Sequence, residues 1–325
     1  MILIITRVFF FIFINTTPEL NGISSLDFDN LFQNSTGPIY NLLQFVLGFV
    51  LENKYLNAFI TAVILLWNAS LLNMLLIRNS AFEENTYIPA ALYVILMSSG
   101  ADNYYLSSQL LGGSFLLWSL IFLQIHLRYK NSDEKVLSIG CSLAIASLIF
   151  IPYGWYLLMA LILFLFYSGT VARRYLLATW GFAMVIIISW LPFLFSSYGS
   201  LFWNDYLSGL IFFQFENEFL INLGITLSVP ILLGLKVSST NLAGMGMTNI
   251  QITMKRVFTW LGLFGILTAL FQSNLNTAAS GVLIISLSYF LTDHLLNTRK
   301  KWIAELTFAG LTLIMLAMLY LNPVY

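Results

Sequence analysis

Apolar runs close to the length of a membrane-crossing helix recur along almost the whole chain. A helix needs about 20 mainly apolar residues to cross the hydrocarbon core of a bilayer. The runs are Ile2 to Ile14, Tyr55 to Ile77, Tyr87 to Ser99, Ser107 to Leu127, Val136 to Ile151, Pro152 to Thr170, Tyr175 to Phe195, Phe219 to Leu235, Val257 to Gln272, Ala278 to Thr292 and Trp302 to Leu321. They predict an all-α, polytopic transmembrane protein with about eleven spans.

The composition agrees with this class. Apolar residues make up 59% of the 325 residues and charged residues 9%, against about 45–50% and 25% in soluble domains. Apolar runs along the whole chain leave no room for a soluble core of normal polarity, so we expect a single membrane domain over residues 1–325. The formal net charge is zero, and nothing in it indicates a nucleic-acid partner.

The basic residues give the orientation. If the eleven runs cross the membrane one after another, twelve of the 14 Lys and Arg residues fall in loops on one side. Such an excess marks the cytoplasmic side. We therefore expect a bacterial inner-membrane protein with a cytoplasmic N-terminus and a periplasmic C-terminus. The basic residues predicted to be cytoplasmic are Arg78, Arg128, Lys130, Lys135, Arg173, Arg174, Lys236, Lys255, Arg256, Arg299, Lys300 and Lys301.

Two segments predicted to be external are longer than simple turns. The first, Thr16 to Lys54, contains Glu19, Asp27 and Asp29, and its part Ile39 to Glu52 is suited to a helix in the interface. The second, Ser196 to Glu218, interleaves acids with aromatic residues. It forms either a surface pocket or an aromatic belt at the membrane interface.

Few residues in the spans indicate chemistry. Cys141 is the one cysteine and we expect it in the core. His126 lies beside Arg128 at the end of a span, where we expect a polar side chain that reaches toward water. Gly112 and Gly113 would allow another helix to approach closely.

Several segments together carry a resemblance. They are Thr17 to Leu20, Ser35 to Tyr40, Glu84 to Tyr93, Asp133 to Gly140 and Arg173 to Leu177. In this order they resemble a family of uncharacterised polytopic inner-membrane proteins of Bacteroidota. That family is similar at its N-terminus to the membrane glycosyltransferases of the GT-C fold, which implies a GT-C-like module over residues 1–198, with an external loop at 16–54, and a C-terminal helical part over 199–325.

The resemblance implies transfer of a sugar from a polyprenyl phosphate to an acceptor on the periplasmic face. A carboxylate must then remove the acceptor proton, and Glu19 is the first candidate, followed by Asp27 and Asp29. The leaving phosphate needs a positive partner. Either acidic residues hold a divalent metal there, or Lys54 binds the phosphate, or the site is not catalytic.

Two other functions stay open. One is a non-catalytic scaffold or accessory subunit of a cell-envelope complex, which would bind other envelope proteins. The other is a transporter, which should show broken helices and polar groups that converge at the midplane. We rank the transporter last because charges are nearly absent from the predicted spans.

Overall fold

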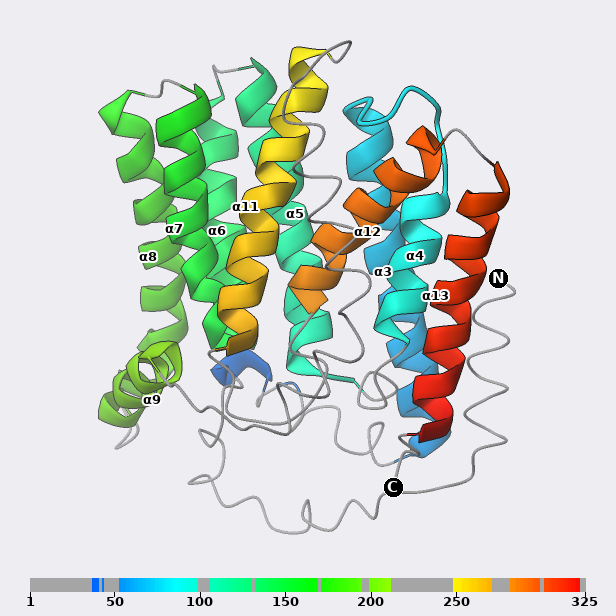
Figure 1. The fold of residues 1–325 in the computed structure, drawn as a ribbon. Helices are drawn as coiled ribbons and strands as arrows, with labels where there is room; N and C mark the ends of the chain where they lie inside the picture. The colour runs from blue at the N-terminus through cyan, green and yellow to red at the C-terminus, as the bar shows by residue number, and fades with distance from the viewer. Residues whose placement is uncertain are drawn as a thin grey trace.

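The computed structural model describes residues 37–40, 43, 53–98, 106–129, 132–168, 171–194, 199–211, 248–270, 281–298 and 301–321. This part of the chain is all-helical (Figure 1). Its elements are α3 (Lys54–Arg78), α4 (Ile88–Met97), α5 (Ser108–Tyr129), α6 (Asp133–Ile149), the 3₁₀-helix η3 (Ile151–Gly154), α7 (Trp155–Leu163), the π-helical turn η4 (Phe164–Ser168), α8 (Ala172–Leu194), α9 (Gly199–Ile211), α11 (Asn249–Leu270), α12 (Gly281–Asn297) and α13 (Lys301–Leu321).

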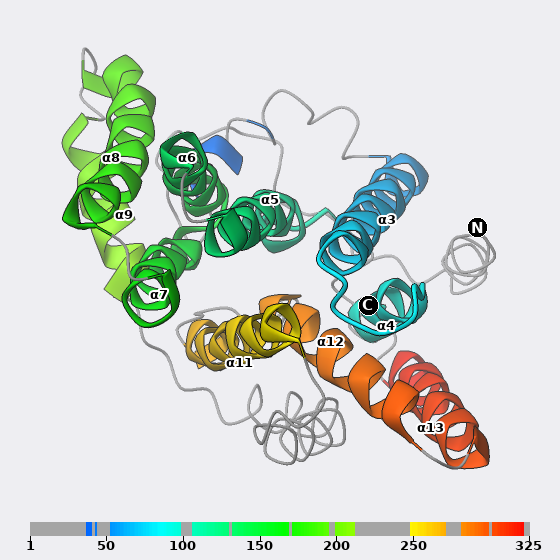
Figure 2. The ribbon, with the colours of Figure 1, turned by 90° about the horizontal axis from the view of Figure 1, so that it is seen from above.

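The longer helices run up and down beside one another, and α9 lies at the lower end of α8, at one edge of the bundle (Figure 1). Viewed from above, one row of helices contains α8, α6, α5 and α3 in that order (Figure 2). Helices α11 and α12 lie beside this row, next to α5 (Figure 2). The contacts between helices give the same neighbours, with α6 between α5 and α8 and with α12 between α11 and α4.

Four described helices are long and apolar enough to cross a membrane: Tyr55–Arg78, Ser108–Tyr129, Ala172–Leu191 and Asn249–Thr268. The predicted count of eleven is not reproduced. The predicted runs Ile2 to Ile14 and Phe219 to Leu235 lie outside the described residues. The runs from Tyr87 to Ser99, from Pro152 to Thr170 and from Ala278 to Thr292 form shorter apolar helices, of which α4 has 10 residues.

The packing of α4 shows why an apolar run need not be a membrane span. Seven of its residues, from Pro89 to Met97, are buried inside the protein. A helix that is apolar on all sides is as consistent with a protein core as with lipid, so an apolar run alone overstates the number of spans.

Local sequence explains where helices start and stop. The side chain of Asn53 caps α3, since its Oδ1 accepts hydrogen bonds from the backbone N–H groups of Tyr55 at 3.2 Å and Leu56 at 3.4 Å. Between α6 and α7, Phe150 is extended and Pro152 lies in the first turn of η3. The break predicted between Ile151 and Pro152 therefore falls at η3.

Glycine permits the closest helix contact. A Cβ added to Gly140 of α6 would lie 2.1 Å from the carbonyl oxygen of Ala178 in α8. On the facing helix, a Cβ at Gly181 would lie 2.8 Å from the carbonyl oxygen of Leu137. The two helices pack backbone to backbone here because neither glycine has a side chain. Gly112 plays the predicted role on α5, where a Cβ would lie 3.0 Å from the Tyr153 ring.

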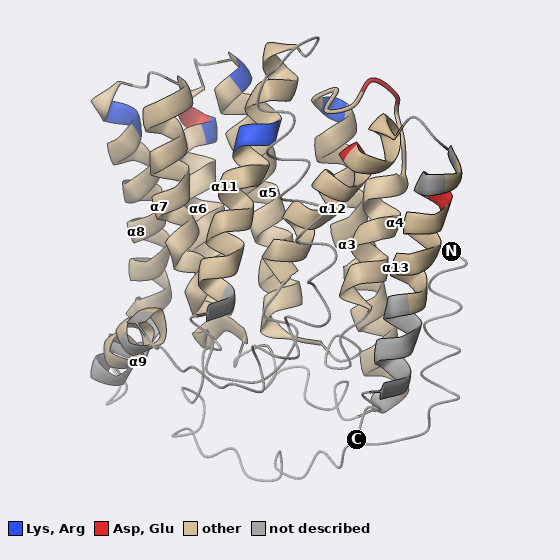
Figure 3. Cartoon of the chain, in the orientation of Figure 1, with Lys and Arg blue, Asp and Glu red and all other residues tan. Residues whose placement is uncertain are grey.

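Charged side chains gather toward one end of the described bundle (Figure 3). Arg78 ends α3, Arg128 lies in the last turn of α5, and Arg173 lies in the first turn of α8. We call this the basic end, and the end that carries α9 the opposite end. The clustering expected from the sequence is thus seen for the described helices.

Candidate functional site

The opposite end holds a cluster of polar and aromatic side chains around η3. Because η3 interrupts the path from α6 to α7, Tyr153 is turned inward, is 2% exposed, and donates a hydrogen bond from its hydroxyl to the carbonyl oxygen of Gln109 at 3.1 Å. Tyr156, one turn later, is fully buried and its hydroxyl lies 3.1 Å from Thr268 Oγ1 in α11. These bonds join α5, α7 and α11 at this end.

A described piece of the long segment 16–54 is fixed at the same place. The N–H of Gly37 donates to the carbonyl oxygen of Ile149 at 2.9 Å, and the Tyr40 hydroxyl donates to that of Leu106 at 2.6 Å. A Cβ on Gly37 would lie only 2.0 Å from the carbonyl oxygen of Leu148, so glycine is required for this approach. Residues 37–40 therefore sit directly on the end of α6.

Helix α9 supplies the other wall of the cluster. The Tyr206 hydroxyl shares a short hydrogen bond with Ser147 Oγ of α6, and the indole N–H of Trp155 donates to the carbonyl oxygen of Leu210 at 3.1 Å. Phe202 and Tyr206 are buried against α6 and η3, and Ile39 packs against the same group. Segment 37–40 and α9 thus meet on one small hydrophobic cluster.

An apolar groove of about 250 Å³ opens beside this cluster. It is lined by Gly154, Trp155, Leu157, Leu158 and Leu161, by Phe182 of α8, and by Tyr206 and Leu210 of α9. Small-molecule sites usually measure about 300–1,000 Å³. The groove is therefore suited to a stretch of hydrocarbon chain, with its polar groups, Trp155 and Tyr206, at the end near α9.

The described part of the segment Ser196 to Glu218, residues 199–211, has features of both predicted alternatives, the pocket and the aromatic belt. Tyr206 lines the groove, as a pocket would require. Trp203 instead stacks edge-on against Trp190 of α8, with ring centroids 5.8 Å apart, and is part of an aromatic surface. The carboxylate of Asp205 lies outside the described side chains.

The carboxylates predicted as catalytic cannot be placed in this cluster. Glu19, Asp27 and Asp29 lie outside the described residues. Lys54 is the first residue of α3, and its side chain is not described. Helix α3 packs on α4 and α5, whereas α9 packs on η3 and α8, so α5 and α6 separate the start of α3 from the groove. In the part of the chain that the structure describes, no group of three or more His, Cys, Asp or Glu could hold a metal ion.

The structure shows a buried ion pair that the sequence did not predict. Lys255 of α11 and Asp293 of α12 have side chains 10% and 7% exposed, with Nζ and Oδ2 3.0 Å apart. Asn297 donates from Nδ2 to Asp293 Oδ1 at 2.8 Å. The sequence predicts Lys255 in a loop because the apolar run begins at Val257, but α11 begins at Asn249.

The expectation for His126 is wrong. Its side chain is fully buried rather than directed toward water, and its ring lies edge-on to Phe164 with centroids 5.1 Å apart. Neither ring nitrogen has a hydrogen-bond partner among the described residues. Phe164, the first residue of the π-helical turn η4, covers the His126 ring. The sequence around His126 does not indicate that this turn packs on it.

A second polar network joins α3 to α5 within the bundle. Asn68 donates from Nδ2 to the carbonyl oxygen of Leu110 at 2.9 Å and accepts at Oδ1 from Ser114 Oγ at 2.6 Å. Nearer the start of α3, Asn57 Oδ1 accepts from the N–H of Leu106 at 2.9 Å. All these side chains are buried and partnered, so they fix the register of two helices.

The described helices define an all-helical protein with four candidate membrane spans. No protein-family model, no curated protein and no solved structure matches the chain.

Proposed function

We propose that this chain is a multi-pass inner-membrane protein that binds a lipid-linked sugar in the groove between α7, α8 and α9 and transfers the sugar on the periplasmic face. The basic end then faces the cytoplasm, in line with the positive-inside rule. The observation that carries the proposal is the apolar groove, which opens beside the cluster where α9 and residues 37–40 of the long early segment meet.

The groove supports a polyprenyl ligand through its shape and lining. Its sides are leucines and aromatic rings, and the Trp155 N–H and the Tyr206 hydroxyl are already bonded within the protein. The lining therefore matches the long apolar chain of a polyprenyl phosphate.

The proposed chemistry uses the early segment. Glu19 acts as the base that removes the proton from the acceptor hydroxyl, while Asp27 and Asp29 support it. The acceptor oxygen forms a bond to the anomeric carbon as the bond from that carbon to the phosphate oxygen breaks. The phosphate departs with the electron pair and needs a positive partner. A divalent metal is favoured over Lys54 in this role, because α5 and α6 separate the start of α3 from the groove.

Two pairs of substitutions, each a variant with its control, test ligand binding and sugar transfer separately. Leu158→Trp fills the groove, and Leu313→Trp on α13 is the control because both side chains are exposed leucines, at 46% and 65%. A photoreactive polyprenyl phosphate in vesicles should label the wild type and the control, and should label the Leu158→Trp variant about tenfold less. Equal labelling of all three would remove the groove from the proposal.

The second pair concerns transfer from polyprenyl-phosphate-linked hexoses. Glu19→Gln should lower the rate about 10²–10⁴-fold, the usual contribution of a positioned general base, and Asp102→Asn should leave it unchanged. A wild-type rate in the Glu19→Gln protein would exclude this base. Absence of transfer by the wild type itself would favour the scaffold function instead.

A further inference from the structure

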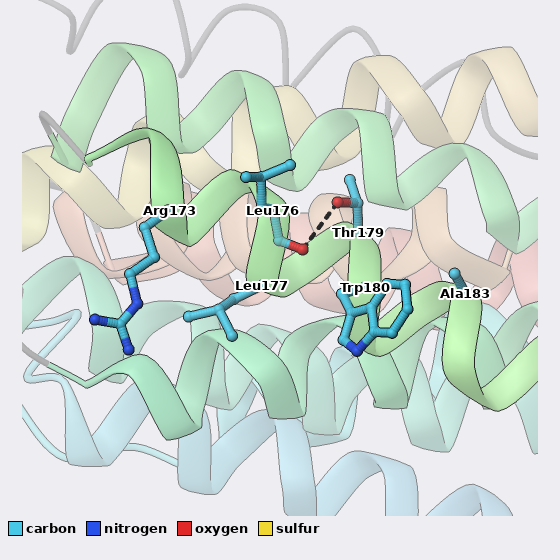
Figure 4. A pocket seen from close by; sticks show the side chains of 6 residues that line it. All are labelled: Arg173, Leu176, Leu177, Thr179, Trp180 and Ala183. Carbon is cyan, nitrogen blue, oxygen red and sulfur yellow. Dashed lines mark hydrogen bonds between the residues drawn. The ribbon is translucent and has the colours of Figure 1, made fainter.

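A second apolar hollow lies on α8 at the basic end, away from the groove described above. It has a volume of about 530 Å³ and is lined by Arg173, Leu176, Leu177, Thr179, Trp180 and Ala183 (Figure 4). We call it the α8 furrow. Figure 4 shows Arg173, Leu177 and Trp180 along one side of the helix, with Arg173 at its start.

Arg173 is the charged group of the furrow. The Thr179 hydroxyl donates within the helix to the carbonyl oxygens of Tyr175 and Leu176, both at 3.0 Å, and so presents little polarity outward. The side chain of Arg173 is 77% exposed. A cation thus stands at one end of an otherwise apolar surface.

The neighbouring carboxylate of Asp133 is shared between Arg173 and Arg174. Asp133 of α6 lies 3.0 Å from Arg174 Nε but 3.6 Å from Arg173, and the Arg174 side chain is only 16% exposed. Asp133 is therefore engaged mainly by Arg174. The Lys135 ammonium of the same turn lies 5.2 Å from the centre of the Phe122 ring in α5 and takes no part in the furrow. The exposed Arg173 guanidinium is therefore the positive group available to a ligand there.

The apolar part of the furrow is open to its surroundings. Leu176 is 69% exposed and Trp180 is 58% exposed. Only 17% of the span within α8 is buried in the protein, against 44% to 67% for the other three candidate spans. In a bilayer this surface contacts lipid tails, while Arg173 lies at the depth of the headgroups.

We propose that the α8 furrow is a binding site for an anionic phospholipid of the cytoplasmic leaflet, with the lipid phosphate on Arg173 and an acyl chain along Leu177 and Trp180. The charge of the furrow matches that of an anionic headgroup, and guanidinium groups bind phosphate through paired donors. Anionic lipids of the cytoplasmic leaflet attract basic side chains that lie near the membrane surface. This site is independent of glycosyl transfer and requires only the membrane placement.

Native mass spectrometry of purified protein in an equal mixture of phosphatidylglycerol and phosphatidylethanolamine tests the proposal. The wild type should retain phosphatidylglycerol in preference, and Arg173→Ala should reduce that preference about fivefold, the effect of one basic residue near the lipid surface. Arg173→Lys keeps the charge and should retain most of the preference. Trp180→Ala should reduce retention of both lipids.

Arg128→Ala is the matched control, since Arg128 is also an exposed arginine at the basic end but does not line the furrow. It should behave as the wild type. The proposal is overturned if Arg173→Ala retains the wild-type preference, or if Arg128→Ala loses as much, because the effect would then be one of general surface charge.

Discussion

The ion pair between Lys255 and Asp293 should be costly to break from either side. Lys255→Met leaves a carboxylate that is 7% exposed, and Asp293→Asn leaves an ammonium that is 10% exposed. Removal of one partner of a buried pair typically costs about 3–5 kcal/mol, because the remaining charge is uncompensated. Lys255 lies in the second turn of α11, near the basic end, so its charge can partly relax toward water and we expect about 3 kcal/mol for each single change.

The double variant distinguishes a pair from two separate defects. With both charges removed, no buried charge is left, and the free energy of unfolding should fall by about 1 kcal/mol or less. Equilibrium unfolding in mixed detergent micelles, with all four proteins of the cycle, measures the coupling. If the losses of the two single variants simply add in the double variant, the two side chains do not act as a pair and the reasoning is refuted.

Three further predictions follow from the packing and the orientation. Gly140→Val should destabilise the α6–α8 contact strongly, because its Cβ would lie 2.1 Å from a backbone oxygen, whereas Gly310→Ala, with nothing within 4 Å, should be neutral or slightly stabilising in thermal unfolding. Asn68→Ala should lower the free energy of unfolding by about 1–3 kcal/mol, because it leaves the Ser114 hydroxyl without its acceptor. Ser70→Ala is the control, since the Ser70 hydroxyl bonds only within its own helix, and a smaller loss for Asn68→Ala than for this control would contradict the prediction. Cysteines at Asp102 and at Ser132 should differ in labelling of intact cells by an impermeant thiol reagent, with only the former labelled; the reverse pattern would invert the orientation.

Much of the helical class could be predicted from the sequence, and the span count could not. The run from Ser107 to Leu127 corresponds to α5 almost residue for residue. Apolar content does not distinguish a helix that faces lipid from one enclosed by its neighbours, and α4 is of the second kind. Length and burial together make that distinction, and burial is a property of the packed structure.

The candidate site was predictable only in outline. The two long segments were expected on one side, and residues 37–40 and α9 do lie together at the opposite end. The groove itself depends on η3, which turns α7 so that Trp155 and Leu158 face α8 and α9. A Pro152–Gly154 pair indicates a break but not the direction of the helix after it. Buried His126 and the ion pair at Lys255 were missed for the same reason, since each depends on which helices become neighbours.

The contacts at the opposite end also set an order of events during synthesis. The hydrogen bond from Tyr40 to Leu106 joins residues 66 apart, that between Ser147 and Tyr206 spans 59, and that from Trp155 to Leu210 spans 55. A ribosome must therefore complete α8 before α9 can cross to its place over η3. Until then the groove has only its α7 and α8 walls. The arrival of α9 adds Tyr206 and Leu210, so the last of these segments to be translated completes the groove.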